Sequence, residues 1–414
     1  MKLNKSMFGW IMYDFANSSY VTVIVTVVYS VYFKDVVVGS GELGTALWGR
    51  AMSLSMLMVA ISAPIFGAIA DHSKSKKKFL FINCYIAVIF TALLFFVREG
   101  DIVKGMLFFI IANFGFNSGN VFYNALLGDV ASREDMGKVS GWGWGVGYIG
   151  GLLSLVLVLP LVQNDLTPLV FPTIAVFFGV FALITFILVK ELKQKQKKKN
   201  YFRIAYERIY TTSRNIKNFR ELLKFFVSYL LYNDGIIIVI SFAAIYGATR
   251  FGMSQEQLIV YFIIANLSSI LGALIFGYVL DRIGAKTTIS ITLIIWILVV
   301  LGAFFSQTIT HFYLVGLLAG IAIGSSQSSS RTMLALLTPD EKMAEFFGFY
   351  AFTGKMASIA GPFIYGEIAR ITQDQRYAIL SVLFFFVTGG LILQTVNEKR
   401  GRDNAESWTI SQKE

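Results

Sequence analysis

The chain has 414 residues, of which 56% are hydrophobic and 15% are charged. These values exclude an ordinary soluble domain, which is roughly 45 to 50% apolar and about 25% charged. The formal net charge of +11 does not indicate a nucleic-acid-binding protein, because the basic residues lie in short segments between apolar runs. The single cysteine, Cys84, excludes a disulfide framework and a cysteine-based metal cluster.

Twelve apolar runs are separated by charged or turn-rich breaks. A helix of about 20 apolar residues crosses the roughly 30 Å hydrocarbon core of a bilayer. We therefore expect an all-α membrane protein, whose first run has no Ala-x-Ala cleavage site behind it and stays in the protein. The expected membrane helices cover residues 8–33, 46–70, 79–97, 105–127, 140–162, 169–189, 225–248, 257–280, 287–306, 312–336, 345–368 and 377–396.

The orientation follows from the distribution of positive charge. The expected inner segments contain 27 Lys and Arg residues and the outer segments seven, while Arg331 and Lys355 fall within spans. Short loops rich in Lys and Arg stay on the cytoplasmic side. We therefore expect a multi-pass protein of the cell membrane, with both termini in the cytoplasm.

A long hydrophilic segment divides the chain after six spans. We expect an N-terminal half at residues 1–190, a basic cytoplasmic linker at 191–224, a C-terminal half at 225–396 and a cytoplasmic tail at 397–414. Apolar residues recur at near-helical spacing in the linker, which is typical of a helix lying on the membrane surface. A flexible, solvated linker is the alternative, and the sequence leaves both open.

The two halves share a loop motif. Gly67 precedes Asp71 by four residues and basic residues follow, and the same pattern recurs at Gly277 and Asp281, 210 positions later. The second copy continues with Arg282 and Lys286. Duplicated six-helix halves are typical of a transporter that rocks between two states, rather than of a receptor or a membrane enzyme.

Both copies resemble the loop motif of the major facilitator superfamily. That resemblance implies a fold of twelve transmembrane helices in two pseudo-repeated halves, and it implies that Asp71 and Asp281 act as gates by pairing with loop cations. The segments Tyr-Asp-Phe-Ala-Asn-Ser at 13–18 and Leu-Tyr-Asn-Asp-Gly at 231–235 further resemble the vacuole-effluxer-like family. This implies a solute carrier, with amino acids as the substrate associated with the fungal members.

Polar residues inside the spans are candidates for solute binding, because a buried polar group in hydrocarbon needs a partner or a cavity. Asn113, Asn117, Asn120 and Asn124 share one face of the fourth helix, where they can line a solute path or join packed helices. Glycines repeat every four residues in the fifth and tenth helices, which favours close helix packing.

The first helix of each half carries two polar residues deep in the span. These are Asp14 and Asn17 in the first half, and Asn233 and Asp234 in the second. We expect the two amides to contact solute. The two carboxylates can carry a coupled proton, since burial brings an acid toward the range where it loads and unloads. Permanent pairing with a buried cation is the alternative.

Lys355 is expected about 16 Å from the cytoplasmic end of the eleventh helix, near the bilayer centre. An ammonium there requires an anionic partner. Either a solute carboxylate fills that role, which would suit an amino acid, or a fixed acid does, with Asp14 and Asp234 as the deepest candidates.

The sequence contains no motif for nucleotide hydrolysis or for a histidine-based metal or catalytic site. No phosphate-binding loop is present, since Met356 follows Lys355 where Ser or Thr is needed, and the two histidines, His72 and His311, are too far apart for a site. We therefore expect no enzyme, cofactor or metal, and a monomer driven by an ion or proton gradient, as symporter or antiporter. The rival classes are a membrane-embedded enzyme or lipid-handling protein and a non-transporting solute receptor.

Overall fold

The computed structural model describes residues 4–39, 41–72, 75–131, 136–191, 219–339 and 343–411. The surface helix is predicted on apolar residues from 205 to 223, of which those up to 218 lie outside the described residues, while Leu223 belongs to the first turn of α9. Nearly all of the described residues are helical. They belong to two compact units, formed by residues 1–207 with 241–260 and by residues 208–240 with 261–414.

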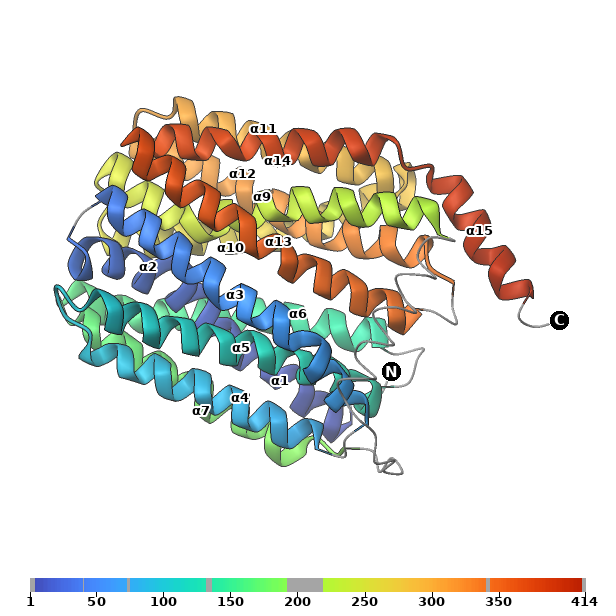
Figure 1. Cartoon of the computed structure of the whole chain (residues 1–414), viewed down its shortest axis with the longest axis horizontal. Coiled ribbons are helices and arrows are strands. Elements are labelled where there is room, and N and C mark those ends of the chain that lie inside the picture. The colour runs from blue at the N-terminus through green and yellow to red at the C-terminus, as the bar shows by residue number, and fades with distance from the viewer. Residues whose placement is uncertain are drawn as a thin grey trace. The chain divides into compact units, whose positions relative to one another are not determined.

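The first helix of the chain, dark blue in Figure 1, runs without a break and contains two π-helical segments. It is made of α1 (Lys5–Ser19), η1 (Tyr20–Val27), α2 (Val28–Tyr32) and η2 (Phe33–Val37). The other helices of the first half are α3 (Gly41–His72), α4 (Lys76–Leu93), extended by η3 (Leu94–Phe96), α5 (Ile102–Val130), α6 (Met136–Gln163) and α7 (Thr167–Leu188).

The second half repeats this series of six and adds a terminal helix. The six are α9 (Arg220–Phe251), α10 (Gln255–Ile283), α11 (Ala285–Phe305), α12 (Ile309–Leu336), α13 (Met343–Thr372) and α14 (Gln375–Gln394). The terminal helix is α15 (Glu398–Ser411), which follows α14 after a short break.

Eleven of these helices, within the described residues, are long and apolar enough to cross a membrane. A further long helix, α13, has 30 residues and completes the second series of six. The prediction of twelve transmembrane helices in two six-helix halves is therefore confirmed. Large apolar side chains such as Val103, Ile187 and Tyr278 are 74 to 80% exposed, as expected of surfaces that face hydrocarbon.

The repeated glycines of the tenth helix serve packing, as predicted. In α12, a side chain at Gly316 would meet the ring of Tyr261, and one at Gly324 would meet the backbone of Ser269 in α10. Without side chains at these positions the two backbones approach closely, which is the usual basis of helix association in membranes.

Replacing Gly324 by valine should destabilise the second half. The added Cβ would lie 2.8 Å from the backbone nitrogen of Ala273, and a backbone cannot move aside as a side chain can. Overpacking of this kind costs about 1 to 3 kcal/mol or more. Thermal unfolding in detergent should show a lower midpoint for Gly324→Val than for the matched control Gly145→Val, where nothing lies within 4 Å of the added Cβ.

Candidate functional site

The first helix of each half carries the same short pattern of aromatic and polar residues. Residues 10–15 read Trp-Ile-Met-Tyr-Asp-Phe in α1, and residues 229–234 read Tyr-Leu-Leu-Tyr-Asn-Asp in α9, 219 positions later. Asp14 thus corresponds to Asn233, and Phe15 corresponds to Asp234. Sequence reasoning identified the polar members of both segments but missed the alignment of the aromatic ones.

In the first unit, this segment forms an acidic cluster of Trp10, Tyr13, Asp14 and Tyr123. Trp10 stacks on Tyr123 with ring centroids 4.4 Å apart, and its indole N–H donates to the Tyr123 carbonyl at 3.0 Å. The Tyr123 hydroxyl lies within interaction range of the Asp14 carboxylate. On the other side, a side chain at Gly143 of α6 would collide with Asp14 and Trp10. Asp14 is therefore held between α5 and α6, and it is only half-buried.

In the second unit, the equivalent segment contributes to a basic cluster of Tyr229, Tyr232, Arg331 and Tyr350. Tyr229 stacks on Tyr350 with centroids 4.1 Å apart, and the Tyr232 hydroxyl lies 2.8 Å from Ser330 Oγ. The Arg331 guanidinium is close enough to act electrostatically on both Tyr229 and Tyr350.

Lys355 directly follows the residue of α13 that packs against this cluster. Its neighbour Gly354 has no side chain, so that the Tyr229 hydroxyl lies within 3.1 Å of where a Cβ would be. The Asn233 amide donates to the Gly354 carbonyl at 3.4 Å. Lys355 itself is half-buried.

Asp234 has a different environment from Asp14. It is 2% exposed, and its Oδ1 accepts a hydrogen bond from the backbone N–H of Gly361 in α13 at 3.0 Å. None of the ion pairs formed by the described residues includes Asp234. The structure therefore separates the two acids that the sequence presented as equivalent.

The asparagine stripe of the fourth helix divides along its length. Asn113 is buried and donates to Ser55 Oγ in α3 at 2.7 Å, so this amide joins two packed helices, while the half-buried Asn117 donates to Asn113 within α5. Asn120 is half-buried with its Oδ1 enclosed, and Asn124 is exposed. Asn17 is buried in α1.

Only part of the two gate motifs lies within the described residues. The side chain of Asp71, that of Asp281 and the surroundings of Gly67 lie outside the described residues. Gly277 is half-buried with open space around it, and Arg282 is exposed.

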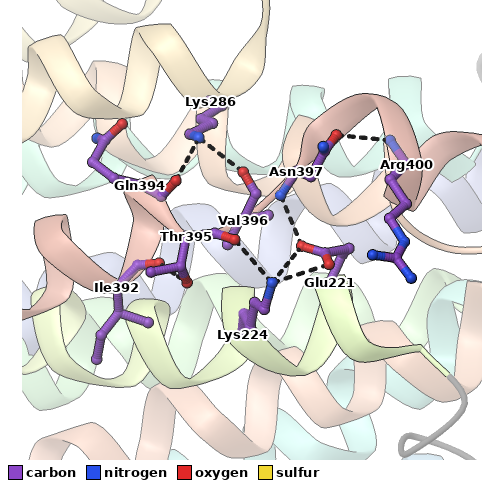
Figure 2. A network of polar contacts seen from close by, with 9 residues as sticks. All are labelled: Glu221, Lys224, Lys286, Ile392, Gln394, Thr395, Val396, Asn397 and Arg400. Atoms are coloured by element: carbon purple, nitrogen blue, oxygen red, sulfur yellow. Dashed lines mark hydrogen bonds and ion pairs between the residues drawn. The ribbon is translucent and has the colours of Figure 1, made fainter.

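Lys286 belongs to a polar network where α9 and α11 begin and α14 ends, shown in Figure 2. Its ammonium donates to the carbonyls of Gln394 and Val396 at 2.9 and 2.8 Å. Its backbone N–H donates to the carboxylate of Glu398 at 2.9 Å, at the first turn of α11. A carboxylate at this place satisfies an otherwise unpaired N–H and complements the helix dipole.

The first unit contains the equivalent contact. The backbone N–H of Lys76, in the first turn of α4, donates to Glu191 at 2.6 Å, and Lys76 corresponds to Lys286 at a distance of 210 positions. The Lys76 ammonium also forms a buried ion pair with Asp129 at 3.0 Å. Glu191 and Glu398 each follow the sixth helix of their half, and we call them the capping glutamates.

A third acid completes the network of Figure 2. Glu221, 3% exposed at the start of α9, accepts from the backbone N–H of Asn397 at 2.7 Å and from the Lys224 ammonium at 3.0 Å. Lys224 also donates to the Thr395 carbonyl. Sequence reasoning missed Glu191, Glu221 and Glu398; the signal was their position at the ends of helices and, for Glu191 and Glu398, at matching places in the two halves.

Comparisons with known proteins agree with this architecture. The family model described as "Vacuole effluxer Atg22 like" matches residues 47–136 and 128–406. A Bacillus subtilis (strain 168) protein described as an uncharacterized MFS-type transporter, YxiO, is 31% identical over 419 residues that cover 97% of each chain. Autophagy-related protein 22 of Kluyveromyces lactis is 24% identical, covering 85% of this chain and 80% of its own.

Solved structures share the fold at low sequence identity. The nucleoside transporter NupG matches with a TM-score of 0.69 and 16% identity, covering 95% of this chain and 98% of its own. A bacterial homolog of the human lysosomal transporter Spinster matches with a TM-score of 0.70 and 13% identity over 97% of each chain. The chain therefore belongs to the vacuole effluxer Atg22-like family and is a multi-pass transporter of the major facilitator type.

Proposed function

We propose that this transporter is a secondary active carrier of a small zwitterionic solute, an amino acid or a related compound. It works by alternating access, Asp14 couples it to protons, and Lys355 binds the solute carboxylate. We place it in the cell membrane with both termini in the cytoplasm, because the predicted inner loops carry most of its positive charge.

The observation that carries this proposal is the pair of clusters built on equivalent segments of α1 and α9. The first cluster places the Asp14 carboxylate beside Tyr123. The second places the Arg331 guanidinium beside Tyr229 and Tyr350, and Lys355 follows the glycine that packs against Tyr229. An acid matches a solute ammonium or a proton, and a cation matches a carboxylate. The acid of the first unit therefore suits a coupled proton, and the cations of the second unit suit a solute carboxylate.

The amides supply the neutral part of the proposed site. We assign solute contacts to Asn120 and Asn124 of α5, which are the less buried members of the stripe, and to Asn233, beside Lys355. Asn117 and Asn17 complete the set. Their role is to accept and donate hydrogen bonds that replace solute hydration.

Flux in proteoliposomes tests the proposal. The purified protein is reconstituted, and a panel of amino acids, nucleosides, sugars and carboxylic acids is assayed with and without an imposed pH gradient. Accumulation of a zwitterion that needs the gradient supports the proposal. Flux of nucleosides or sugars alone contradicts the substrate class, and binding of solute without flux indicates a receptor.

The gate motif leads to a separate prediction for Asp281→Asn. We expect exchange between inward and outward states to slow several-fold with little change in solute affinity, because a gate residue changes populations without touching solute. Labelling of single cysteines from each side, in a Cys84→Ser background, measures this exchange. Asp165→Asn, which removes an exposed acid at an outer turn, is the matched control. Unchanged labelling in Asp281→Asn contradicts the gate role.

A further inference from the structure

We infer that Asp234 is a positioning residue that fixes α13 against α9 and thereby places Lys355, and that its hydrogen-bond acceptor rather than its acid–base chemistry is what transport requires. The inference concerns a residue that the proposed proton pathway does not use. It rests on the proposed function only for the role of Lys355.

The contact itself is specific. Asp234 Oδ1 lies 3.0 Å from the Gly361 nitrogen and is enclosed, with the residue 2% exposed. A side chain at Gly361 would collide with that oxygen and would lie 2.7 Å from Ile238 Cδ1. The carboxylate therefore reaches the α13 backbone only because position 361 is glycine.

The contacted turn of α13 is the one that most needs support. Pro362 follows Gly361 inside the helix and has no N–H to donate to the preceding turn. Prolines at such positions kink helices, and neighbouring polar groups must fix the direction of the kink. Asp234 accepts a hydrogen bond from the Gly361 N–H, directly before the proline, where a kink changes the direction of the helix.

A second contact lies two turns earlier on α13. There the Asn233 amide donates to the Gly354 carbonyl, and the Tyr229 hydroxyl lies against the same glycine. Lys355 stands between the two contacts, one residue after Gly354 and six before Gly361. Consecutive residues of α9, Asn233 and Asp234, thus hold both ends of the segment that carries Lys355.

The first unit makes the equivalent contact without an acid. Gly150 of α6 corresponds to Gly361, and a side chain there would collide with the backbone carbonyl of Phe15, the counterpart of Asp234. Both halves therefore place an oxygen of the first helix against a glycine of the fifth. In the first unit that oxygen belongs to the backbone, so close packing of these two helices does not require a titratable group.

The decisive variants are Asp234→Asn, which keeps an oxygen acceptor, and Asp234→Ala, which removes it. In proteoliposomes we expect Asp234→Asn to retain pH-driven accumulation within about threefold of the unmodified protein. We expect Asp234→Ala to raise the KM for the zwitterion about tenfold or more, with a smaller change in kcat, because Lys355 is displaced.

Hydrogen–deuterium exchange supplies a readout that needs no substrate. Peptides covering residues 355–365 should exchange faster in Asp234→Ala than in Asp234→Asn or in the unmodified protein, because the Gly361 N–H loses its acceptor. If the unmodified protein transports no zwitterion, the proposed function fails while this exchange result still decides the positioning role.

Two outcomes would overturn the inference. One is loss of pH-driven accumulation in Asp234→Asn with counterflow preserved, which identifies a proton-carrying acid. The other is identical exchange in residues 355–365 for Asp234→Ala and the unmodified protein. Should Asp234→Ala fail to fold, Asp234→Asn alone still separates the two roles.

Discussion

Replacing Lys355 by methionine should leave a folded, monodisperse protein whose affinity for zwitterionic and anionic ligands falls roughly 10- to 100-fold or more. Hydrogen bonds to a charged group contribute about 1.5 to 3 kcal/mol, and about 1.4 kcal/mol corresponds to a tenfold change in affinity. Methionine keeps most of the length of the side chain and removes the charge together with its N–H donors. Ligand-induced shifts in thermal unfolding and equilibrium binding in detergent measure the loss.

The alternative role of Lys355, pairing with a fixed acid, predicts a different result. If the ammonium neutralises a fixed acid, Lys355→Met leaves that acid unpaired and lowers the unfolding midpoint, and neutralising the acid in a second variant restores it. Lys399→Met, which removes an exposed lysine from α15, is the matched control for loss of charge. Unaltered ligand affinity in a well-folded Lys355→Met protein removes this residue from the solute site.

Asp14→Asn should abolish accumulation driven by a pH gradient while solute counterflow stays within about threefold of the unmodified rate. Asparagine keeps the shape of the side chain between Tyr123 and Gly143 but cannot take up or release a proton. Counterflow exchanges labelled for unlabelled solute and needs no net proton movement. Uptake of labelled solute and quenching of an enclosed pH dye are measured on the same vesicles.

The control for Asp14→Asn is Asp165→Asn, since Asp165 is an exposed acid at a turn of the same unit. That variant should accumulate solute normally. Full pH-driven accumulation in the Asp14→Asn protein would show that protons do not couple through this acid, and the proposed mechanism would then need another ion or another residue.

The sequence predicts the helices better than it predicts the contacts among polar residues. Apolar runs locate the twelve helices, because crossing hydrocarbon imposes a strong requirement on composition. They underestimate the length of α9, which begins at Arg220 rather than at the predicted residue 225. Its first turn lies beyond the apolar run and is held by Glu221, whose partner Asn397 is 176 positions away.

The distinction between Asp14 and Asp234 could not be drawn from the sequence. Both acids lie about equally deep in the first helix of a half, and hydropathy treats them alike. What separates them is a backbone N–H of Gly361, 127 positions distant, and a backbone group leaves no trace in the residue pattern. The aromatic residues of the two clusters could have been predicted from the sequence, because Trp10 and Tyr229 occupy matching positions beside the polar residues already identified in both helices.

The capping glutamates bear on the ancestry of the chain. Glu191 and Glu398 stand 207 positions apart, and the lysines whose backbone N–H groups they accept stand 210 apart. Each glutamate accepts a backbone N–H in the first turn of the third helix of its own unit, as expected if the contact is older than a duplication of six helices. On this view, the start of the linker and the start of α15 descend from one segment, and the linker grew by insertion downstream of an acid that was already in use.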